Sequence, residues 1–169
     1  RAPAALALPA VLLAILLAGL LAACSPHREI YPRLESLAAE GRYEEGAKLV
    51  ESRKDEYGGR NEVLWNLDRG VFYHYAGKYK ESNEAFELAE QRMEELWSES
   101  VSGHIAAFLS NDNTLPYVGE DFEQVVVNIY RALNYAGLGD LEGALVETRK
   151  VNERLTFINS KYEEKDRNE

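Results

Sequence analysis

Cysteine and histidine are scarce in this sequence, and acidic residues outnumber basic ones by 29 to 19. Its 169 residues include one cysteine and three histidines, and the net charge is −10. A single cysteine can form neither a disulfide within the chain nor a cysteine-based metal site. An acidic surface repels phosphate backbones, so nucleic-acid binding is not expected.

Sequence motifs of enzymes are absent as well. His27, His74 and His104 stand far apart and lack partners at the spacing of metal ligands. The sequence has no H-E-x-x-H, no G-x-S-x-G and no P-loop. Adjacent glutamates such as Glu44 and Glu45 do not face each other on a helix and are typical of solvated surface. We therefore expect a protein without catalytic activity, metal or cofactor.

A long apolar run occupies the first 23 residues, in which Arg1 is the only charged side chain. Two interpretations are open. A membrane-spanning helix needs about 20 apolar residues, and residues 4–23 are just long enough. A secretory signal peptide needs an apolar core followed by small residues at a cleavage site. Residues 10–21 supply such a core, and Ala22 and Ala23 supply the small residues.

The end of this run, Leu21-Ala22-Ala23-Cys24, resembles the lipobox of bacterial lipoproteins. In that family the cysteine thiol receives a diacylglyceryl group, the preceding peptide bond is cleaved, and the new amino group is usually acylated. The resemblance thus implies cleavage between Ala23 and Cys24 and lipid attachment at Cys24. Several acyl chains anchor a protein firmly, whereas one gives only marginal binding. Lipid attachment would consume the Cys24 thiol, so the resemblance also implies that Cys24 is not a redox or catalytic residue.

The expected localisation follows from the same resemblance. Residues 1–23 are interpreted as a lipoprotein signal peptide. Residues 24–32, with two prolines and no apolar periodicity, are interpreted as a tether. In the lipoprotein family, a serine such as Ser25 after the cysteine is compatible with the outer membrane. We expect a lipid-anchored protein of the bacterial cell envelope that faces the periplasm, with the outer membrane as its site.

Three stretches of the remaining chain resemble one another, and each contains a glycine followed two residues later by Tyr or Leu. The glycines are Gly41, Gly77 and Gly139, which are 36 and 62 residues apart. The pattern resembles the tetratricopeptide repeat, a 34-residue helix–turn–helix unit. Glycine adopts the left-handed conformation that ends a helix, and small residues let two helices cross closely. Residues 33–169 are therefore predicted to be all-α, a tetratricopeptide-like solenoid of about three hairpins.

Two features of this domain stay open. The alternative to a solenoid is an irregular helical bundle, which is also all-α. The helical pattern continues to the last residue without Gly or Pro, as in a polar cap helix or in the first helix of a further repeat. We favour a chain truncated at its C-terminus.

An insertion, residues 98–123, lengthens the distance between the second and third glycines. The stretch from Pro116 to Asn152 resembles an uncharacterised group of bacterial lipoproteins with tetratricopeptide-like repeats. Loops that interrupt a scaffold often carry function. We therefore name a candidate binding site where the insertion folds over the third repeat, with the residues Tyr117, Glu120, Asp121, Glu147 and Arg149. His74 is a separate candidate, because it lies on a predicted helix of the second repeat and could line the concave face.

Each candidate also has a structural interpretation. Asp121 could cap the helix that follows the insertion. Arg149 could neutralise a buried acid, and His74 could be a hydrogen-bonded structural histidine. The sequence favours the structural interpretation of these residues over a binding role.

Two functions remain for a protein of this kind. The first is an adaptor that binds an envelope protein partner in envelope assembly or secretion, with the membrane reached through the lipid anchor. The second is a periplasmic receptor that binds a small molecule, a glycan or a wall fragment under the insertion. An open groove favours the adaptor, whereas an enclosed pocket favours the receptor.

Overall fold

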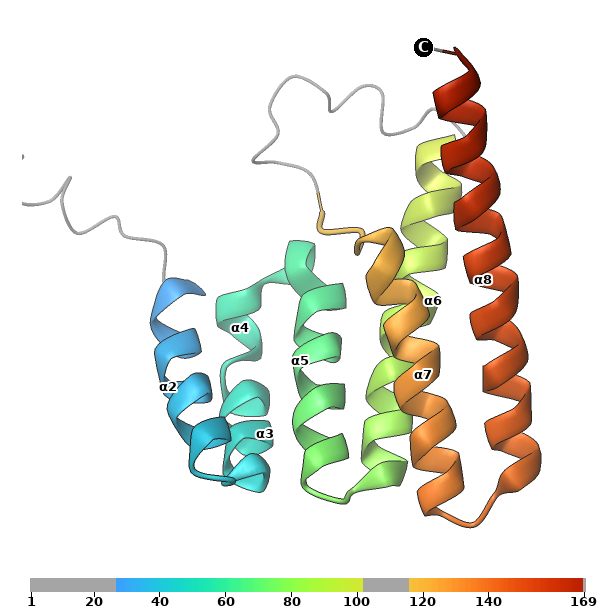
Figure 1. Ribbon diagram of the computed structural model, residues 1–169. Coiled ribbons are helices and arrows are strands. Elements are labelled where there is room, and N and C mark those ends of the chain that lie inside the picture. The colour runs from blue at the N-terminus through green and yellow to red at the C-terminus, as the bar shows by residue number, and fades with distance from the viewer. Residues whose placement is uncertain (1–26, 102–115, 169) are drawn as a thin grey trace, which may run out of the picture.

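The computed structural model describes residues 27–101 and 116–168, and their regular structure is entirely helical. The prediction of an all-α fold is confirmed (Figure 1). The predicted signal peptide, its cleavage site and Cys24 lie outside the described residues. The helices are α2 (His27–Ala39), α3 (Tyr43–Ser52), α4 (Lys54–Tyr57), α5 (Glu62–Tyr75), α6 (Tyr79–Val101), α7 (Asp121–Gly137) and α8 (Leu141–Asn168), with a 3₁₀ turn η2 (Gly59–Asn61).

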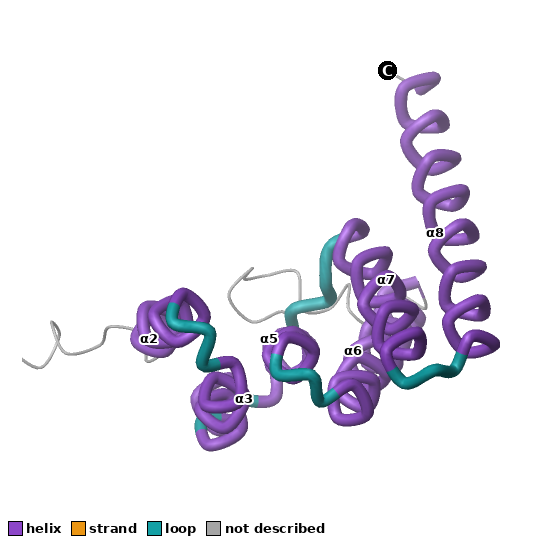
Figure 2. The backbone as a smooth tube through the Cα atoms, turned by 60° about the horizontal axis from the view of Figure 1, so that its bottom comes forward, coloured by secondary structure: helices purple, strands orange, loops and turns teal. Residues whose placement is uncertain are grey.

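The long helices form three antiparallel hairpins in a row: α2–α3, α5–α6 and α7–α8 (Figures 1 and 2). Each hairpin packs on the next, because α3 contacts α5 and α6 contacts α7. Within the described residues, no helix is apolar enough over a sufficient length to span a bilayer.

The same turn closes all three hairpins. Gly41, Gly77 and Gly139 have φ angles of 71°, 72° and 79°. At the second turn, the Gly77 N–H donates to the His74 carbonyl and the Lys78 N–H donates to the carbonyl five residues earlier. The other two turns repeat both bonds, which is the Schellman arrangement that a left-handed glycine permits. The prediction that these glycines end helices is confirmed.

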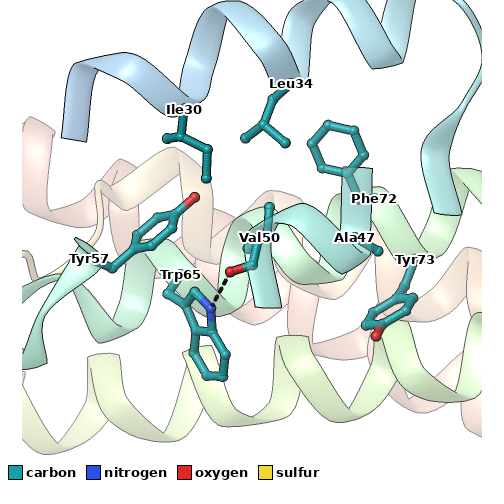
Figure 3. Packing of buried hydrophobic residues seen from close by; sticks show 8 residues of the cluster. All are labelled: Ile30, Leu34, Ala47, Val50, Tyr57, Trp65, Phe72 and Tyr73. Atoms are coloured by element: carbon teal, nitrogen blue, oxygen red, sulfur yellow. Dashed lines mark hydrogen bonds between the residues drawn. The ribbon is translucent and has the colours of Figure 1, made fainter. Parts of the chain in front are cut away.

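Two clusters of buried side chains form the core. The first joins the first hairpin to α5 (Figure 3), where the indole N–H of Trp65 donates to the Val50 carbonyl over 3.1 Å. The second joins α5, α6 and α7 through Val63, Leu67, Phe86, Ala89, Met93, Leu96 and Val127.

Small residues allow close packing inside the hairpins, as expected. A Cβ atom at Gly70 would lie 2.6 Å from the Phe86 ring, so α5 and α6 approach as they do only because Gly70 has no side chain. Ser82 strengthens this contact, because its hydroxyl donates to the Gly70 carbonyl over 2.8 Å.

The predicted tether is wrong for residues 27–32, because α2 begins at His27 and includes Pro32. Proline lacks the N–H that would bond one turn back. However, Ile30, Leu34 and Leu37 recur at helical spacing and are 5%, 3% and 7% exposed. Burial of this apolar stripe outweighs one missing hydrogen bond, which propensity alone does not reveal.

The insertion, residues 98–123, is partly helical. Helix α6 continues into it as far as Val101, and α7 begins at Asp121. Residues 98–101 and 121–123 are thus helical, whereas residues 116–120 have no regular structure. The apolar stretch that begins at His104 lies outside the described residues.

Candidate functional site

An open groove of about 570 Å³ lies between α6 and α8, and α7 forms its floor. Its walls carry charged, amide and apolar side chains: Glu87, Glu90, Gln91, Met93, Glu94, Trp97, Asp121, Gln124, Arg131, Lys150, Glu153, Arg154, Phe157 and Ile158.

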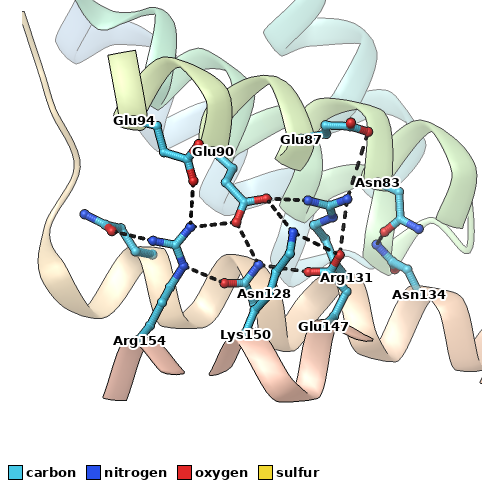
Figure 4. A network of polar contacts seen from close by, with 11 residues as sticks. Asn83, Glu87, Glu90, Glu94, Asn128, Arg131, Asn134, Glu147, Lys150 and Arg154 are labelled. Atoms are coloured by element: carbon cyan, nitrogen blue, oxygen red, sulfur yellow. Dashed lines mark hydrogen bonds and ion pairs between the residues drawn. The ribbon is translucent and has the colours of Figure 1, made fainter. Parts of the chain in front are cut away.

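Glu90 of α6 is the centre of a polar network in the groove floor (Figure 4). Its carboxylate lies 2.5 Å from Arg131 Nη1 and 2.6 Å from Arg154 Nη2. Asn128 Nδ2 and Lys150 Nζ donate to the same carboxylate over 3.1 and 3.3 Å. Three helices therefore meet at one buried acid.

Glu147 of α8 is the second buried acid, with 3% of its surface exposed. It lies 3.3 Å from Arg131 Nη2 and 3.5 Å from Lys150 Nζ, and it accepts a 2.9 Å hydrogen bond from Asn128. Arg154 fixes the orientation of the Asn128 amide, because its Nε donates to Asn128 Oδ1. Buried charges with several partners hold helices in one register, because the loss of any partner is costly.

The pKa of Glu90 shows which effect dominates here. Burial disfavours the charged carboxylate, but hydrogen bonds from Arg154 and Asn128 and the charges of Lys150 and Arg131 outweigh it. They lower the pKa of Glu90 from 4.5 to about 2. Glu90 is therefore ionised throughout the neutral pH range.

The rim of the groove is more acidic than its floor. Glu87 and Glu94 expose 54% and 66% of their side chains, and Glu153 is exposed. The cationic side chains Arg131 and Arg154 are only 6% and 22% exposed and are engaged by the floor acids. An approaching ligand thus meets negative charge first.

The end of the groove towards the last turns of α6 and α8 is apolar. Trp97 and Phe157 are 51% and 56% exposed, and Ile158 lies beside them in the wall. Lys161 crosses this end, with its ammonium 5.8 Å from the Trp97 ring centroid and 2.7 Å from Asp121 Oδ2.

The structure does not bring the predicted site residues together as one site. Tyr117 donates its hydroxyl hydrogen bond to Glu123, and burial followed by the Glu123 carboxylate raises the pKa of Tyr117. Glu120 is exposed and occupies the N-cap of α7, where its N–H donates to Glu123 Oε2 over 2.8 Å. Asp121 is the first helical residue, so the interpretation of Asp121 as the cap is wrong.

The interpretation of Arg149 as the partner of a buried acid is also wrong. Arg149 is exposed and does not neutralise Glu147. Residues two apart on a helix point in different directions, whereas residues three apart share a face. Glu147 therefore pairs with Lys150 of its own helix and with Arg131 of α7. Asp121 lines the groove and Glu147 lies in its floor network, so two of the predicted residues belong to this region.

His74 is a hydrogen-bonded structural histidine, which was the alternative to a role in binding. Its Nδ1 lies 2.6 Å from Asn134 Oδ1, and its ring packs edge-on against Tyr130 at 4.7 Å. Asn134 Nδ2 donates to Ser82 Oγ, whose own hydrogen is given to the Gly70 carbonyl. These bonds fix the Asn134 amide, so His74 Nδ1 carries the proton.

Sequence reasoning missed the groove residues Glu90, Asn128, Arg131, Lys150 and Arg154. One signal was present: Asn128, Arg131 and Asn134 recur every third residue within residues 125–137, which otherwise carry no charged or amide side chain. The described residues bring no three His, Cys, Asp or Glu side chains together as a metal site would require. Comparisons of the chain with protein-family models, with curated proteins and with solved structures gave no match.

Proposed function

We propose that this protein is a lipid-anchored adaptor of the bacterial cell envelope and has no catalytic activity. Its α6–α8 groove binds a basic, partly apolar segment of an envelope protein partner. The single observation that carries the proposal is the groove, which is open, acidic at its rim and apolar at one end. Open grooves in helical repeat proteins suit extended or helical segments, whereas small ligands need enclosure.

The charge of the rim supports a basic partner. The groove lining contains five acidic and three basic side chains, and the basic ones are largely engaged by buried acids. A segment with Lys or Arg would complement Glu87, Glu94 and Glu153. Such complementarity acts mainly on the rate of association and on the choice of partner.

The apolar end supports a segment with at least one large apolar side chain. Trp97 and Phe157 are each about half exposed, which leaves apolar surface for a ligand to cover. Aromatic side chains in a desolvated position are the residues that most often dominate binding energy. Trp97 is therefore expected to be the principal anchor.

A tetratricopeptide-like solenoid is part of this proposal. Support comes from three antiparallel hairpins in a row, each closed by a left-handed glycine in the same hydrogen-bonded turn. Small residues at the closest approach of α5 and α6 add to this support.

The groove is tested by placing a photo-crosslinking amino acid at Glu94 or Glu153 in the full chain in bacterial cells. A matched control carries it at Lys48, which is exposed on α3. We expect envelope-protein adducts from the two groove positions and not from the control. Identical adducts from all three positions would contradict the proposal.

The chemistry of the partner is tested with two synthetic peptides. One contains Lys residues around a central Phe, and the other has Glu in place of each Lys. Binding is followed by the fluorescence of Trp97, with Trp97→Phe to identify its signal. We expect only the Lys peptide to bind, and Glu94→Lys with Glu153→Lys to weaken its binding at least tenfold.

The anchor is tested separately with Cys24→Ser. We expect the serine variant to lose lipid labelling and to sediment no longer with membranes, because lipidation requires the thiol. A processed serine variant that still sediments with outer membranes would show that lipid at Cys24 is not the anchor.

A receptor for a glycan or wall fragment is the second candidate. The observation in its favour is the exposed aromatic pair Trp97 and Phe157, because aromatic rings stack on the apolar faces of sugars. Titration calorimetry with purified wall fragments distinguishes the two. Saturable heat that disappears in Trp97→Ala would favour the receptor, whereas the adaptor predicts no heat.

A further inference from the structure

Lys161 of α8 places a positive charge of the chain itself at the apolar end of the groove. Its Nζ lies 2.7 Å from Asp121 Oδ2 of α7 and 5.8 Å from the ring centroid of Trp97 of α6. Both contacted residues line the groove, and Lys161 reaches them from the turn of α8 that follows Ile158. One ammonium group thus joins a carboxylate and an aromatic ring that belong to two other helices.

A carboxylate beside a tryptophan ring is suited to hold a cation. Cations are attracted to an aromatic ring within about 6 Å of its centroid, and tryptophan gives the strongest attraction. The Asp121 carboxylate adds a charge-assisted hydrogen bond. Tyr162 donates its hydroxyl hydrogen bond to the same carboxylate oxygen over 3.4 Å. Asp121 and Trp97 therefore form a cation subsite, and Lys161 shows how an ammonium group is held there.

The contact that holds Lys161 is weak. The side chains of Lys161 and Asp121 are 43% and 24% exposed. Exposed ion pairs contribute little, because water screens the charges and a long side chain loses freedom. By contrast, Arg131 and Arg154 are 6% and 22% exposed and are bound to the buried Glu90. A ligand can therefore displace Lys161 without breaking the network in the groove floor.

The basic, partly apolar segment proposed for the groove carries both groups that this end can bind. Its apolar side chain would cover Trp97 and Phe157, which are 51% and 56% exposed. A lysine next to that side chain would reach Asp121. Lys161 competes with it, because two ammonium groups at one carboxylate repel each other.

We propose that Lys161 is a displaceable occupant of this cation subsite, and that a lysine of the partner segment replaces it between Asp121 and Trp97. The proposal rests on the function proposed above, in which the groove binds such a segment. Lys161 then lowers the affinity of the groove, since every partner has to displace it. It also selects the partner, because only a segment with a lysine beside its apolar side chain regains the contacts that Lys161 gives up.

The proposal is tested with the full chain, extracted in detergent, and the synthetic peptide that carries Lys residues around a central Phe. The peptide bears a fluorescent label and binding is followed by anisotropy, so the readout does not depend on Trp97. Lys161→Met removes the charge and keeps a long side chain. We expect it to bind the peptide about two- to fivefold more tightly, the range that an exposed ion pair can contribute. Lys161→Arg keeps the competing charge and should bind like the parent.

A second pair of variants separates the subsite from general charge repulsion. Asp121→Asn removes the carboxylate for which the two lysines compete. It should bind the peptide more weakly, and Lys161→Met should give no gain in that background. Lys48→Met removes an exposed charge of α3 and controls for the change in net charge. Circular dichroism melts show whether the fold is retained, and Asp121→Ser replaces Asp121→Asn if the latter does not fold.

The possible outcomes distinguish this proposal from the function on which it rests. Unchanged or weaker binding by Lys161→Met would overturn the proposal, because Lys161 would then be a structural link between α7 and α8. A gain that persists in Asp121→Asn, or an equal gain in Lys48→Met, would overturn it as well. In these cases the parent still binds the peptide, so the proposed function of the groove stands. Absence of binding in the parent and in every variant would contradict both.

Discussion

Arg131 of α7 places Nη1 2.5 Å from Glu90 Oε2 of α6, and only 5% of Arg131 is exposed. Removal of one partner from a buried ion pair leaves an uncompensated charge. We expect Arg131→Met to lower the free energy of unfolding by about 3 kcal/mol, measured by urea denaturation. Arg42→Met, which breaks only exposed ion pairs, should have little effect.

A double variant separates charge from packing at this pair. If Glu90 is destabilising in Arg131→Met because it has lost one of its two arginine partners, Arg131→Met with Glu90→Gln should recover part of the lost stability. Strict additivity of the two single effects would contradict an energetic coupling between Arg131 and Glu90.

The depressed pKa of Glu90 predicts acid sensitivity. A carboxyl group with a pKa of about 2 in the folded state and 4.5 in the unfolded state binds protons more readily when unfolded. Its stabilising contribution is complete above pH 4.5 and is lost as the pH falls towards 2. The loss should reach roughly 3 kcal/mol.

This prediction is checked by urea denaturation at a series of pH values. Glu90→Gln should be less stable at pH 7 and should show a flatter curve between pH 4.5 and 2. The same slope in variant and parent would assign the acid sensitivity to other carboxyl groups.

Features formed by residues close together in the sequence could be predicted, whereas contacts between distant residues could not. The turns at Gly41, Gly77 and Gly139 were predictable, because a helix end is set by neighbouring residues. The groove network was not predictable, because Glu90 pairs with residues 38 to 64 positions away. A buried polar side of a helix looks like a solvated one until its partners are known.

The choice of Arg149 instead of Lys150 shows a second limit. The sequence identified a basic residue beside Glu147 but gave no direction for either side chain. Helix geometry decides this, because the residue three positions on shares the face of Glu147. The helix start at His27 was missed for a related reason: packing of Ile30 and Leu34 overrides the proline signal.

Gly70 should tolerate no side chain. A Cβ there would lie 2.6 to 2.8 Å from three atoms of the Phe86 ring, and Phe86 is itself only 1% exposed. We expect Gly70→Ala to cost about 1–3 kcal/mol by overpacking, measured by thermal and urea denaturation. Phe86→Leu in the Gly70→Ala background should restore part of it.

Gly59→Ala is the matched control for this clash. A Cβ at Gly59 would meet nothing within 4 Å, and Gly59 does not have a positive φ. Alanine there should be neutral or slightly stabilising. A similar cost at both positions would mean that the loss at Gly70 does not arise from the Phe86 ring.

Asn134 should be more important for stability than an ordinary asparagine, because it is fully buried and holds His74, Ser82 and Asn83 together. Asn134→Ala would leave the Nδ1–H of His74 without its acceptor and the Asn83 carbonyl without its donor. Each such buried group costs about 1–3 kcal/mol. Urea denaturation should show this loss, whereas Thr156→Ala, which removes an exposed hydroxyl bond within α8, should have little effect.

Nitrogen NMR gives an independent readout of the same contact. In the parent chain, the neutral His74 ring should carry its proton on Nδ1, because the fixed amide of Asn134 offers only its oxygen. Asn134→Ala removes this acceptor, so the proton should redistribute towards Nε2. A parent spectrum with the proton on Nε2 would mean that His74 does not donate to Asn134, and would reopen a binding role for its ring.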